Sequence, residues 1–266
     1  MKVMTCNIRC STAGDGENAW PLRRDLCCRV IRSRSPDLIC FQEVREDQFA
    51  AFTSAFPEFD AYGVADVPLG RDPVNAIFFR RDAFRLVWAD TFWLSETPHV
   101  PGSRSWESAN IRLAGWVHLS ERSSSREFVV INTHLDHMSG EARRHQAGLI
   151  NAWAAAFPSD CLVILTGDMN CDRRSEAIAS YKAAGWRDTW EAVHGPGEPG
   201  NTVHWFLGPD HMRRTQSFDW WPDDQGKVDW IFVRGDVKVT DAGIVRDHED
   251  GRYPSDHYFV AAELDW

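Results

Sequence analysis

The sequence predicts an α/β protein in which two mixed β-sheets pack face to face with helices on the outside, a four-layer α/β sandwich. The first half alternates strand, loop, helix, strand and helix, which is typical of α/β folds with buried strands. The second half shares this coarse plan and has a strand-helix-strand core of its own. The 266 residues include neither a low-complexity linker nor a short-period repeat, so we expect residues 1–266 to form a single domain.

The N-terminal elements follow from apolar spacing and from helix breakers. Lys2–Asn7 is a short apolar strand, and a polar loop separates it from a helix that opens at Trp20. Apolar residues recur in that helix at near-helical spacing, at Leu22, Leu26, Val30 and Ile31. Pro36 ends the helix, the run LICFQEV is the second strand, and residues 46–56 are the second helix.

The remaining apolar runs predict further strands and two helices. We expect strands over residues 75–79, 84–93, 108–119, 127–135, 161–166, 227–233, 237–245 and 256–264. Amphipathic patterns predict helices over residues 141–157 and 174–184. Residues 195–225 are rich in Gly, Pro, Asp and His, which predicts a long loop.

Composition restricts the class of protein. Hydrophobic residues make up 43% and charged residues 26% of the chain, as in globular proteins with a large core. No apolar run approaches the ~20 residues that a membrane span requires, and the N-terminus does not resemble a signal peptide. The seven cysteines are scattered, without metal-type pairing. We therefore expect a cytoplasmic protein with reduced thiols, no membrane contact and no obligate protein partner.

The net charge of −10 does not favour general nucleic-acid binding, which depends on a basic surface that neutralises phosphates. Basic residues do cluster locally, in the pairs Arg143-Arg144, Arg173-Arg174 and Arg213-Arg214. We interpret each pair as solvated surface charge. Most of the thirteen tryptophans are expected in the core, although Trp220 and Trp221 stand in a Pro/Asp-rich stretch and are candidate cleft residues.

Polar side chains gather within or just after the predicted strands, at Asn7, Glu43, His134, Asp168, Asn170, Asp229, Asp256 and His257. In α/β folds, ligand sites are built at strand ends. Carboxylates that converge on one rim favour a bound cation, and oxygen ligands favour Mg²⁺ or Mn²⁺. Each residue taken singly has an ordinary structural explanation, such as a turn or a helix cap. The prediction of a metal site therefore rests on their combination.

This combination resembles the endonuclease/exonuclease/phosphatase superfamily, which includes deoxyribonucleases, sphingomyelinases, inositol-polyphosphate 5-phosphatases and deadenylases. The matching segments occur in the family's order: TCNIR (5–9), FQEV (41–44), NTHLDH (132–137), TGDMN (166–170), KVDWIFV (227–233) and PSDHYFV (254–260). They span almost the whole chain, and TGDMN with SDH is quite specific. The resemblance implies a divalent-metal-dependent phosphoric ester hydrolase that uses an activated water.

The resemblance also implies which residues hold the metal and the water. Glu43 resembles the main metal ligand, with Asp256 and Asn7 near the same ion. Asp168 resembles the group that orients or deprotonates the attacking water, and Asn170 resembles the residue that steadies this carboxylate. Such a carboxylate is needed because water must be aimed in line with the bond that breaks.

The other matching residues are implied to contact the phosphoryl group. Asp229 and His257 resemble an Asp–His dyad, in which the aspartate fixes the imidazole and favours its charged form. His134 matches a second histidine of the deoxyribonuclease and sphingomyelinase branches. Asn7 and Arg112 are expected substrate contacts. Cationic and amide donors here stabilise the charge that builds on the phosphoryl oxygens in the transition state.

We predict a small soluble phosphate ester as the substrate. The first alternative is a nuclease or RNA-end-trimming exonuclease with the same centre, which would need a basic track beside the site. The second alternative is a non-catalytic binding protein on this scaffold. We expect specificity to lie in loops over residues 11–20, 95–107 and 195–225. Candidate contacts in these loops are Trp20, Trp106, His204, Trp205, His211 and Trp220. The leaving group, the preference for mono- or diesters, the number of metal ions and the oligomeric state stay open.

Overall fold

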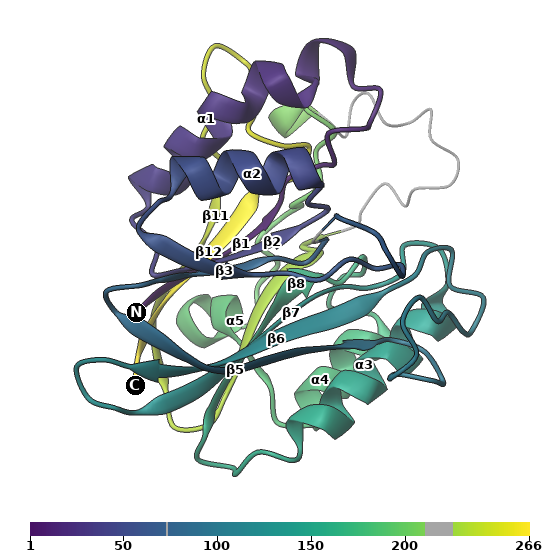
Figure 1. Ribbon diagram of the computed structural model, residues 1–266, viewed down its shortest axis with the longest axis vertical. Coiled ribbons are helices and arrows are strands. Elements are labelled where there is room, and N and C mark those ends of the chain that lie inside the picture. Colours follow the sequence, from purple (N-terminus) through teal and green to yellow (C-terminus); the bar gives the residue numbers. More distant parts are fainter. Residues whose placement is uncertain (73, 211–225) are drawn as a thin grey trace.

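The computed structural model describes residues 1–72, 74–210 and 226–266, and two six-stranded sheets form its centre (Figure 1). The first sheet contains β1 (Lys2–Asn7), β2 (Leu38–Gln42), β3 (Phe59–Tyr62), β4 (Ile77–Arg80), β11 (Lys238–Val245) and β12 (Phe259–Asp265). The second contains β5 (Phe84–Trp93), β6 (Leu113–Glu121), β7 (Glu127–His134), β8 (Leu162–Asp168), β9 (Arg187–Asp188) and β10 (Asp229–Arg234). Their spatial orders are β11-β12-β1-β2-β4-β3 and β5-β6-β7-β8-β10-β9.

Each sheet contains one parallel pair of strands joined through a helix. β1 and β2 pair in parallel, and α1 (Trp20–Ser33) lies between them in the chain. β7 and β8 also pair in parallel, and α3 (Gly140–Ala154) lies between them. The two sheets are mixed because their other pairings, such as β1 with β12 and β10 with β8, are antiparallel. The carboxyl ends of the two parallel pairs meet where Asn7 contacts Asp168.

Alternating side chains of the strands form the core between the sheets. Val3 of β1 packs in one apolar cluster with Val130 and Ile164 of the second sheet. The next residue, Met4, belongs instead to the cluster beneath the helices that cover the first sheet. This period of two is the pattern of a strand that is buried on both faces.

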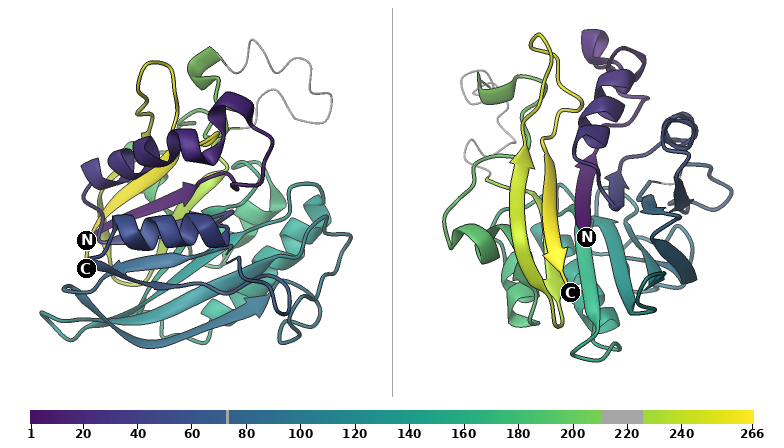
Figure 2. Two further views of the ribbon diagram at one scale, coloured as in Figure 1. Left: turned by 45° about the horizontal axis from the view of Figure 1, so that its top comes forward. Right: turned by 90° about the vertical axis from the view of Figure 1, so that its left-hand side faces the viewer.

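Helices cover the outer face of each sheet, so the molecule has four layers (Figures 1 and 2). α1 and α2 (Glu46–Ala55) pack on the first sheet, and α3 and α4 (Glu176–Ala183) pack on the second. The predicted sandwich of two mixed sheets with outer helices is confirmed. Within the described parts of the chain, no helix has both the length and the apolar character needed to cross a membrane.

Several element boundaries differ from the predictions for identifiable reasons. The strand expected over 108–119 begins at Leu113, because Asp136 binds residues 108–110 as a loop. The strand expected over 256–264 begins at Phe259, because the preceding residues contact residues 202–205 instead.

The helices also differ from the predictions at their ends. The helix expected over 174–184 begins at Glu176, because the Ser175 side chain accepts a hydrogen bond from the backbone of Ile178 and caps the first turn. The helix expected over 141–157 ends at Ala154. The sequence prediction missed β3, β9 and α5 (Thr189–His194), which have four, two and six residues. Elements this short carry too little periodicity to be recognised.

Candidate active site

Strand register brings the predicted residues of the second sheet together. Asp168 at the end of β8 lies opposite His134 of β7 on one side and Asp229 of β10 on the other. Asp229 begins its strand while Asp168 ends its own, because β10 and β8 are antiparallel. Gly167 permits this close pairing, since a Cβ atom there would lie 2.2 Å from the carbonyl oxygen of Thr133.

Asp168 lies at the centre of the cluster. Its Oδ2 accepts a hydrogen bond from Asn7 Nδ2 at 2.9 Å and lies 3.4 Å from His134 Nε2 and 3.9 Å from His257 Nε2. Its Oδ1 accepts a hydrogen bond from the backbone nitrogen of Asn170 at 2.8 Å. Burial, followed by repulsion from Asp229, raises the pKa of Asp168 to about 7. A carboxyl group with this pKa is suited to accept a proton near neutral pH.

Asp229 and His257 form the expected dyad. His257 Nδ1 and Asp229 Oδ2 are 2.9 Å apart, and both side chains are buried. Burial opposes the charged imidazole, but the Asp229 carboxylate outweighs it and raises the pKa of His257 to about 10. The imidazole is therefore a cation at neutral pH and directs Nε2 toward Asp168. Asp229 Oδ1 is buried and has no hydrogen-bond partner among the described residues.

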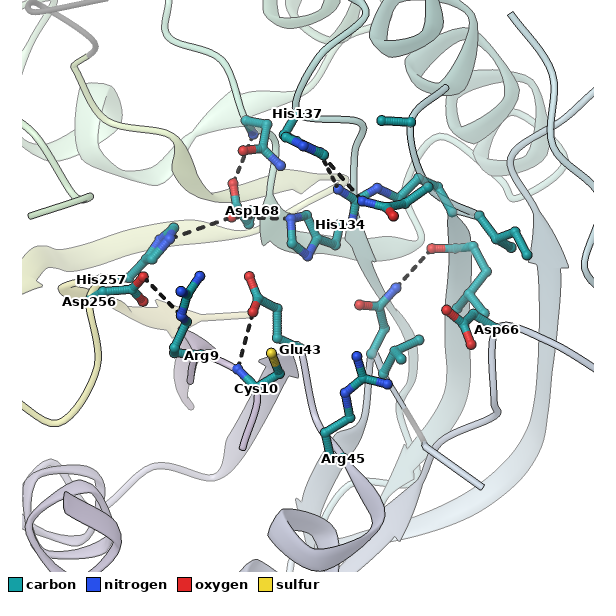
Figure 3. Close-up of a pocket in the computed structure, with 18 of the residues that line it drawn as sticks. Arg9, Cys10, Glu43, Arg45, Asp66, His134, His137, Asp168, Asp256 and His257 are labelled. Carbon is teal, nitrogen blue, oxygen red and sulfur yellow. Dashed lines mark hydrogen bonds and ion pairs between the residues drawn. The ribbon is translucent and has the colours of Figure 1, made fainter. Parts of the chain in front are cut away.

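Glu43 and Asp256 come from the first sheet and reach the same cavity. Glu43 follows β2 with a positive φ of 64°, a conformation that costs a non-glycine residue energy and is concentrated at functional sites. Its two carboxylate oxygens accept hydrogen bonds from Asn7 Nδ2 and the Cys10 backbone nitrogen, each at 3.1 Å. Asp256 Oδ2 lies 3.6 Å from Arg9 Nε. The cluster thus presents several carboxylates around one space (Figure 3).

These carboxylates are suited to a divalent cation. Burial raises the pKa of Asp256, whereas burial of Glu43 is outweighed by the Asn7 hydrogen bond and nearby cations, so the pKa of Glu43 is lowered. Among the described residues, polar atoms of Asp168, Asp229 and His257 all lie within 4.8 Å of one another, so negative charge is concentrated beside this space. One carboxylate oxygen here, Asp229 Oδ1, is buried without a hydrogen-bond partner in the described part of the chain. Such an oxygen suits a hard divalent cation, which prefers oxygen ligands.

The remaining predicted residues lie beside this cluster in specific orientations. The amide of Asn7 bridges Glu43 and Asp168 as a donor, while its Oδ1 accepts from the Arg9 backbone nitrogen. Asn170 steadies Asp168 through its backbone nitrogen, because its side-chain amide donates to the carbonyl of Leu135. Both arrangements preserve the orientation of the central carboxylates.

His134 and Arg112 differ in charge although both lie near Asp168. Burial, Arg112 and His257 hold the pKa of His134 well below its usual value, so its imidazole is neutral. Arg112 lines the cavity, and its Nη2 lies 3.4 Å from His137 Nδ1. Its Nε is buried and has no hydrogen-bond partner within the described residues. The guanidinium therefore keeps donor capacity for a ligand.

A cavity of about 590 Å³ connects these groups, and it includes residues that the sequence prediction missed. Arg9 and His137 belong to the quoted segments TCNIR and NTHLDH, so their motifs could have indicated them. Arg45, Asp66 and Asn75 also line the cavity. They lie in loops without a recognisable motif, and only the tertiary structure identifies them.

The loop residues proposed as substrate contacts divide into four groups. Trp205 lines the cavity. Trp106 stacks on His145 at a centroid distance of 4.7 Å, and Trp20 is a core residue with 4% exposure, so neither lines the cavity. His204 is buried and stacks on Tyr258. The last group, His211, Trp220 and Trp221, lies outside the described residues, as does the pair Arg213-Arg214, which the sequence analysis interpreted as surface charge.

The two described arginine pairs contact their own surroundings instead of the cavity. Arg143 Nη1 donates to the carbonyl of Asp136, and Arg144 lies 3.6 Å from Glu176. Arg173 donates to the carbonyl of Pro196, and Arg174 pairs with Asp172. None of these four arginines lines the cavity. Among the described residues, they therefore do not form the basic track that a nuclease would need.

Comparison with known proteins identifies the family. A profile of the Endonuclease/Exonuclease/phosphatase family matches residues 4–257. The chain belongs to this family. Family members include phosphatases and nucleases, and they typically depend on a divalent metal, which agrees with the buried acidic and histidine cluster.

Solved structures of bacterial proteins share the whole fold. A mannosyl-6-phosphatase from Bacteroides thetaiotaomicron is 26% identical, with a TM-score of 0.86 and full coverage of both chains. A conserved protein of unknown function from Enterococcus faecalis is 28% identical, with a TM-score of 0.86 over 100% of this chain and 99% of that one. Both likenesses extend from the first strand to the last.

A curated relative comes from a eukaryote. Nocturnin of Drosophila melanogaster is 26% identical over 288 residues, which cover 92% of this chain. The chain spans 42% of the length of Nocturnin.

Proposed function

We propose that this protein is a divalent-metal-dependent phosphoesterase that hydrolyses a small soluble phosphate ester by direct attack of water. The observation that carries the proposal is the environment of Asp168. This carboxylate is steadied by Asn7 and the backbone of Asn170, and it faces the buried Asp229–His257 dyad in the cavity. Such a set combines a water-orienting base with a fixed cation.

The metal ligands in this proposal are Glu43 and Asp256, with Asn7 beside them, and the ion is Mg²⁺ or Mn²⁺. When bound, the ion supplies positive charge to the phosphoryl oxygens. Carboxylate and amide oxygens are the ligands that such ions prefer. Arg9, which lies 3.6 Å from Asp256, helps to balance the negative charge of this group.

Asp168 and the Asp229–His257 dyad orient the water and stabilise the phosphoryl charge in the proposal. Asp168 orients the water and accepts its proton, for which a pKa of about 7 is suitable. His257 stays protonated because Asp229 supports its charge, and its Nε2 donates to a phosphoryl oxygen as charge develops there. Neutral His134 and the free Nε of Arg112 supply further donors in the proposal.

A small substrate is favoured over a nucleic acid. The net charge is −10, and the arginines that line the cavity, Arg9, Arg45, Arg104 and Arg112, are matched by four carboxylates in the same lining. The cavity volume of about 590 Å³ lies within the range of roughly 300–1,000 Å³ of small-molecule sites. The mannosyl-6-phosphatase from Bacteroides thetaiotaomicron, with full coverage of both chains, supports a phosphorylated small molecule as the substrate class.

The proposal is tested by measuring hydrolysis with protein from which metal has been removed and to which it is then returned. Phosphomonoesters, phosphodiesters, DNA and RNA are compared before and after Mg²⁺ or Mn²⁺ is restored. We expect metal-dependent hydrolysis of a small ester and a loss of about 10²- to 10⁴-fold in Asp168→Asn, because the base is removed. Asp172→Asn is the matched control, since Asp172 lies on the same segment outside the cavity.

Two results would contradict this proposal. Faster hydrolysis of DNA or RNA than of any small ester would favour the nuclease alternative. A protein that hydrolyses no compound in the panel and binds neither Mg²⁺ nor Mn²⁺ in a titration would favour a binding protein on this scaffold.

A further inference from the structure

The cavity continues past the proposed catalytic groups to a second end formed by Arg45, Asp66 and Asn75, which we call the acceptor end. Figure 3 shows Arg45 and Asp66 on the opposite side of Glu43 from Asp256. No residue of the acceptor end has a role in the proposed hydrolysis. Its chemistry therefore concerns the part of the substrate that does not react.

Asn75 presents an acceptor to the cavity. Its side chain is 4% exposed, and its Nδ2 donates to the carbonyl of Leu113 at 2.9 Å. This bond determines which side of the amide is free. The Oδ1 atom is buried and has no hydrogen-bond partner among the described residues. A buried acceptor of this kind is costly unless a ligand or water donates to it.

Asp66 supplies a second acceptor beside it. Trp93 Nε1 donates to the backbone carbonyl of Asp66 at 2.8 Å and holds this loop against β5. The partly buried carboxylate has no ion pair within the described residues, and it accepts hydrogen bonds from the backbone N–H groups of Asp66 and Val67. Burial raises the pKa of Asp66, and nearby Arg45 acts in the opposite direction. The carboxylate thus keeps oxygen lone pairs available to a donor.

Arg45 supplies donors but little net positive charge. Its Nη1 donates to Asp72 Oδ2 at 2.8 Å, so a carboxylate already offsets its charge. The guanidinium still carries other N–H groups and lines the cavity. The acceptor end therefore has two acceptors and one neutralised donor group. Hydroxyl groups both donate and accept hydrogen bonds, so they can pair with both kinds of group.

We propose that the acceptor end binds the hydroxyl groups of a sugar or polyol whose phosphate ester lies at the Asp168 end of the cavity. This inference rests on the proposed phosphoesterase function and adds the substrate class and the residues that select it. Asp66 and Asn75 accept from hydroxyl groups, and Arg45 donates to a neighbouring hydroxyl oxygen. A phosphate ester without hydroxyl groups would leave Asn75 Oδ1 without a donor, and discrimination follows from that cost.

Two kinds of phosphomonoester, one with hydroxyl groups and one without, test the inference. Wild type, Asp66→Ala and Asn75→Ala are assayed with hexose 6-phosphates and with p-nitrophenyl phosphate, in Mg²⁺ or Mn²⁺. We expect wild type to prefer a hexose phosphate. In both variants, we expect kcat/KM for the hexose phosphate to fall about 10- to 100-fold more than kcat/KM for p-nitrophenyl phosphate. A smaller amount of folded enzyme would lower kcat/KM equally for both substrates, so an unequal decrease excludes that explanation.

Control variants distinguish a failure of this inference from a failure of the proposed phosphoesterase function. Asp25→Asn, on the exposed side of α1, should leave both substrates unaffected. Asp66→Asn keeps an acceptor oxygen, so it should retain more hexose-phosphate activity than Asp66→Ala. Equal losses on both substrates, or no preference of wild type for hydroxylated esters, would overturn the inference while the phosphoesterase stands. If wild type hydrolysed neither ester in the presence of metal, the proposed function would fail as well.

Discussion

Burial acts differently on the two ionisable groups at the centre of the cavity. It raises the pKa of Asp168 to about 7, because the charged carboxylate loses water and faces Asp229. It would lower the pKa of His257, but the Asp229 carboxylate reverses the effect and raises this pKa to about 10. Between these values the carboxylate is ionised and the imidazole is protonated. One buried aspartate thus adjusts both groups.

The raised pKa of Asp168 predicts a pH-dependent cost in the metal-free protein. In the unfolded chain an aspartate has a pKa of 3.8 and releases this proton near that pH, but the folded chain holds the proton until about pH 7. Wild type therefore loses stability from this group as pH rises from about 4 to 7. The variant Asp168→Asn has no carboxyl group at this position, so its stability does not fall for this reason as pH rises. We expect its free energy of unfolding, relative to wild type, to rise by up to about 4 kcal/mol across this range.

Urea unfolding at pH 4.5 and at pH 8, with a chelator present, measures this difference. Asp172→Asn is again the control, because the Asp172 side chain binds the nearby backbone and guanidinium of Arg174. A free-energy difference between Asp168→Asn and wild type that does not change with pH would show that Asp168 titrates normally in the fold.

At the scale of elements, one carboxylate organises the wall of the cavity that contains Arg112. Asp136 follows β7 and accepts hydrogen bonds from five donors in two loops. They are Ser108 Oγ and the backbone nitrogens of Ala109, Asn110, Met138 and Ser139. These bonds lower the pKa of Asp136 although burial opposes the shift. The same bonds end the loop before β6 and hold it beside His137.

Removal of this carboxylate should affect both stability and substrate binding. We expect Asp136→Ala to lower the free energy of unfolding by about 2–4 kcal/mol, because several buried donors lose their partner. We also expect KM to rise more than kcat falls, since Arg112 is positioned by this wall while Asp168 is not. Denaturant unfolding and steady-state kinetics are the measurements, with Asp160→Ala in an exposed loop as control. An unchanged KM in a destabilised variant would assign Asp136 to folding alone.

At the scale of the whole molecule, the site depends on how the two sheets pack. A buried polar network joins them next to the cavity. Gln42 Nε2 of β2 donates to Asn132 Oδ1 of β7 at 2.7 Å, and Asn132 Nδ2 donates to the Phe41 carbonyl at 2.7 Å. Such a network specifies one relative position of the sheets, because any other would leave buried polar groups without partners. Glu43, from the first sheet, is thereby held near Asp168, from the second.

A metal held by residues of both sheets should stabilise the entire fold. We expect Mg²⁺ or Mn²⁺ at about 100 times its Kd to add about 2.7 kcal/mol to the free energy of unfolding of metal-stripped wild type. Thermal unfolding measures the effect as a rise in Tm. Glu43→Gln should lose most of this rise, whereas Glu58→Gln, on the exposed surface, should keep it. A rise of the same size in both variants would exclude Glu43 as a ligand.

The sequence predicted some residues of the site and missed others. Glu43, Asp168, Asp229 and Asp256 were recognised because each lies next to an apolar run and the order matches a family: Glu43 and Asp168 follow such a run, and Asp229 and Asp256 precede one. Asp66 and Asn75 were not, because they lie in a loop and at a strand entrance that carry no periodicity. The single domain and the cytoplasmic location remain predictions.

The sequence by itself determined the class of the protein: apolar periodicity dictates which segments are buried strands and helices, and the order of polar residues at strand ends identifies the family. Only the tertiary structure decided which polar groups share one cavity. Asn7 and Asp168 are 161 positions apart, yet their side chains are 2.9 Å apart. Contacts of this kind depend on sheet packing, register and desolvation, which no local pattern encodes. For the same reason, the charge states of Asp168 and His257 followed from burial and from Asp229, not from their motifs.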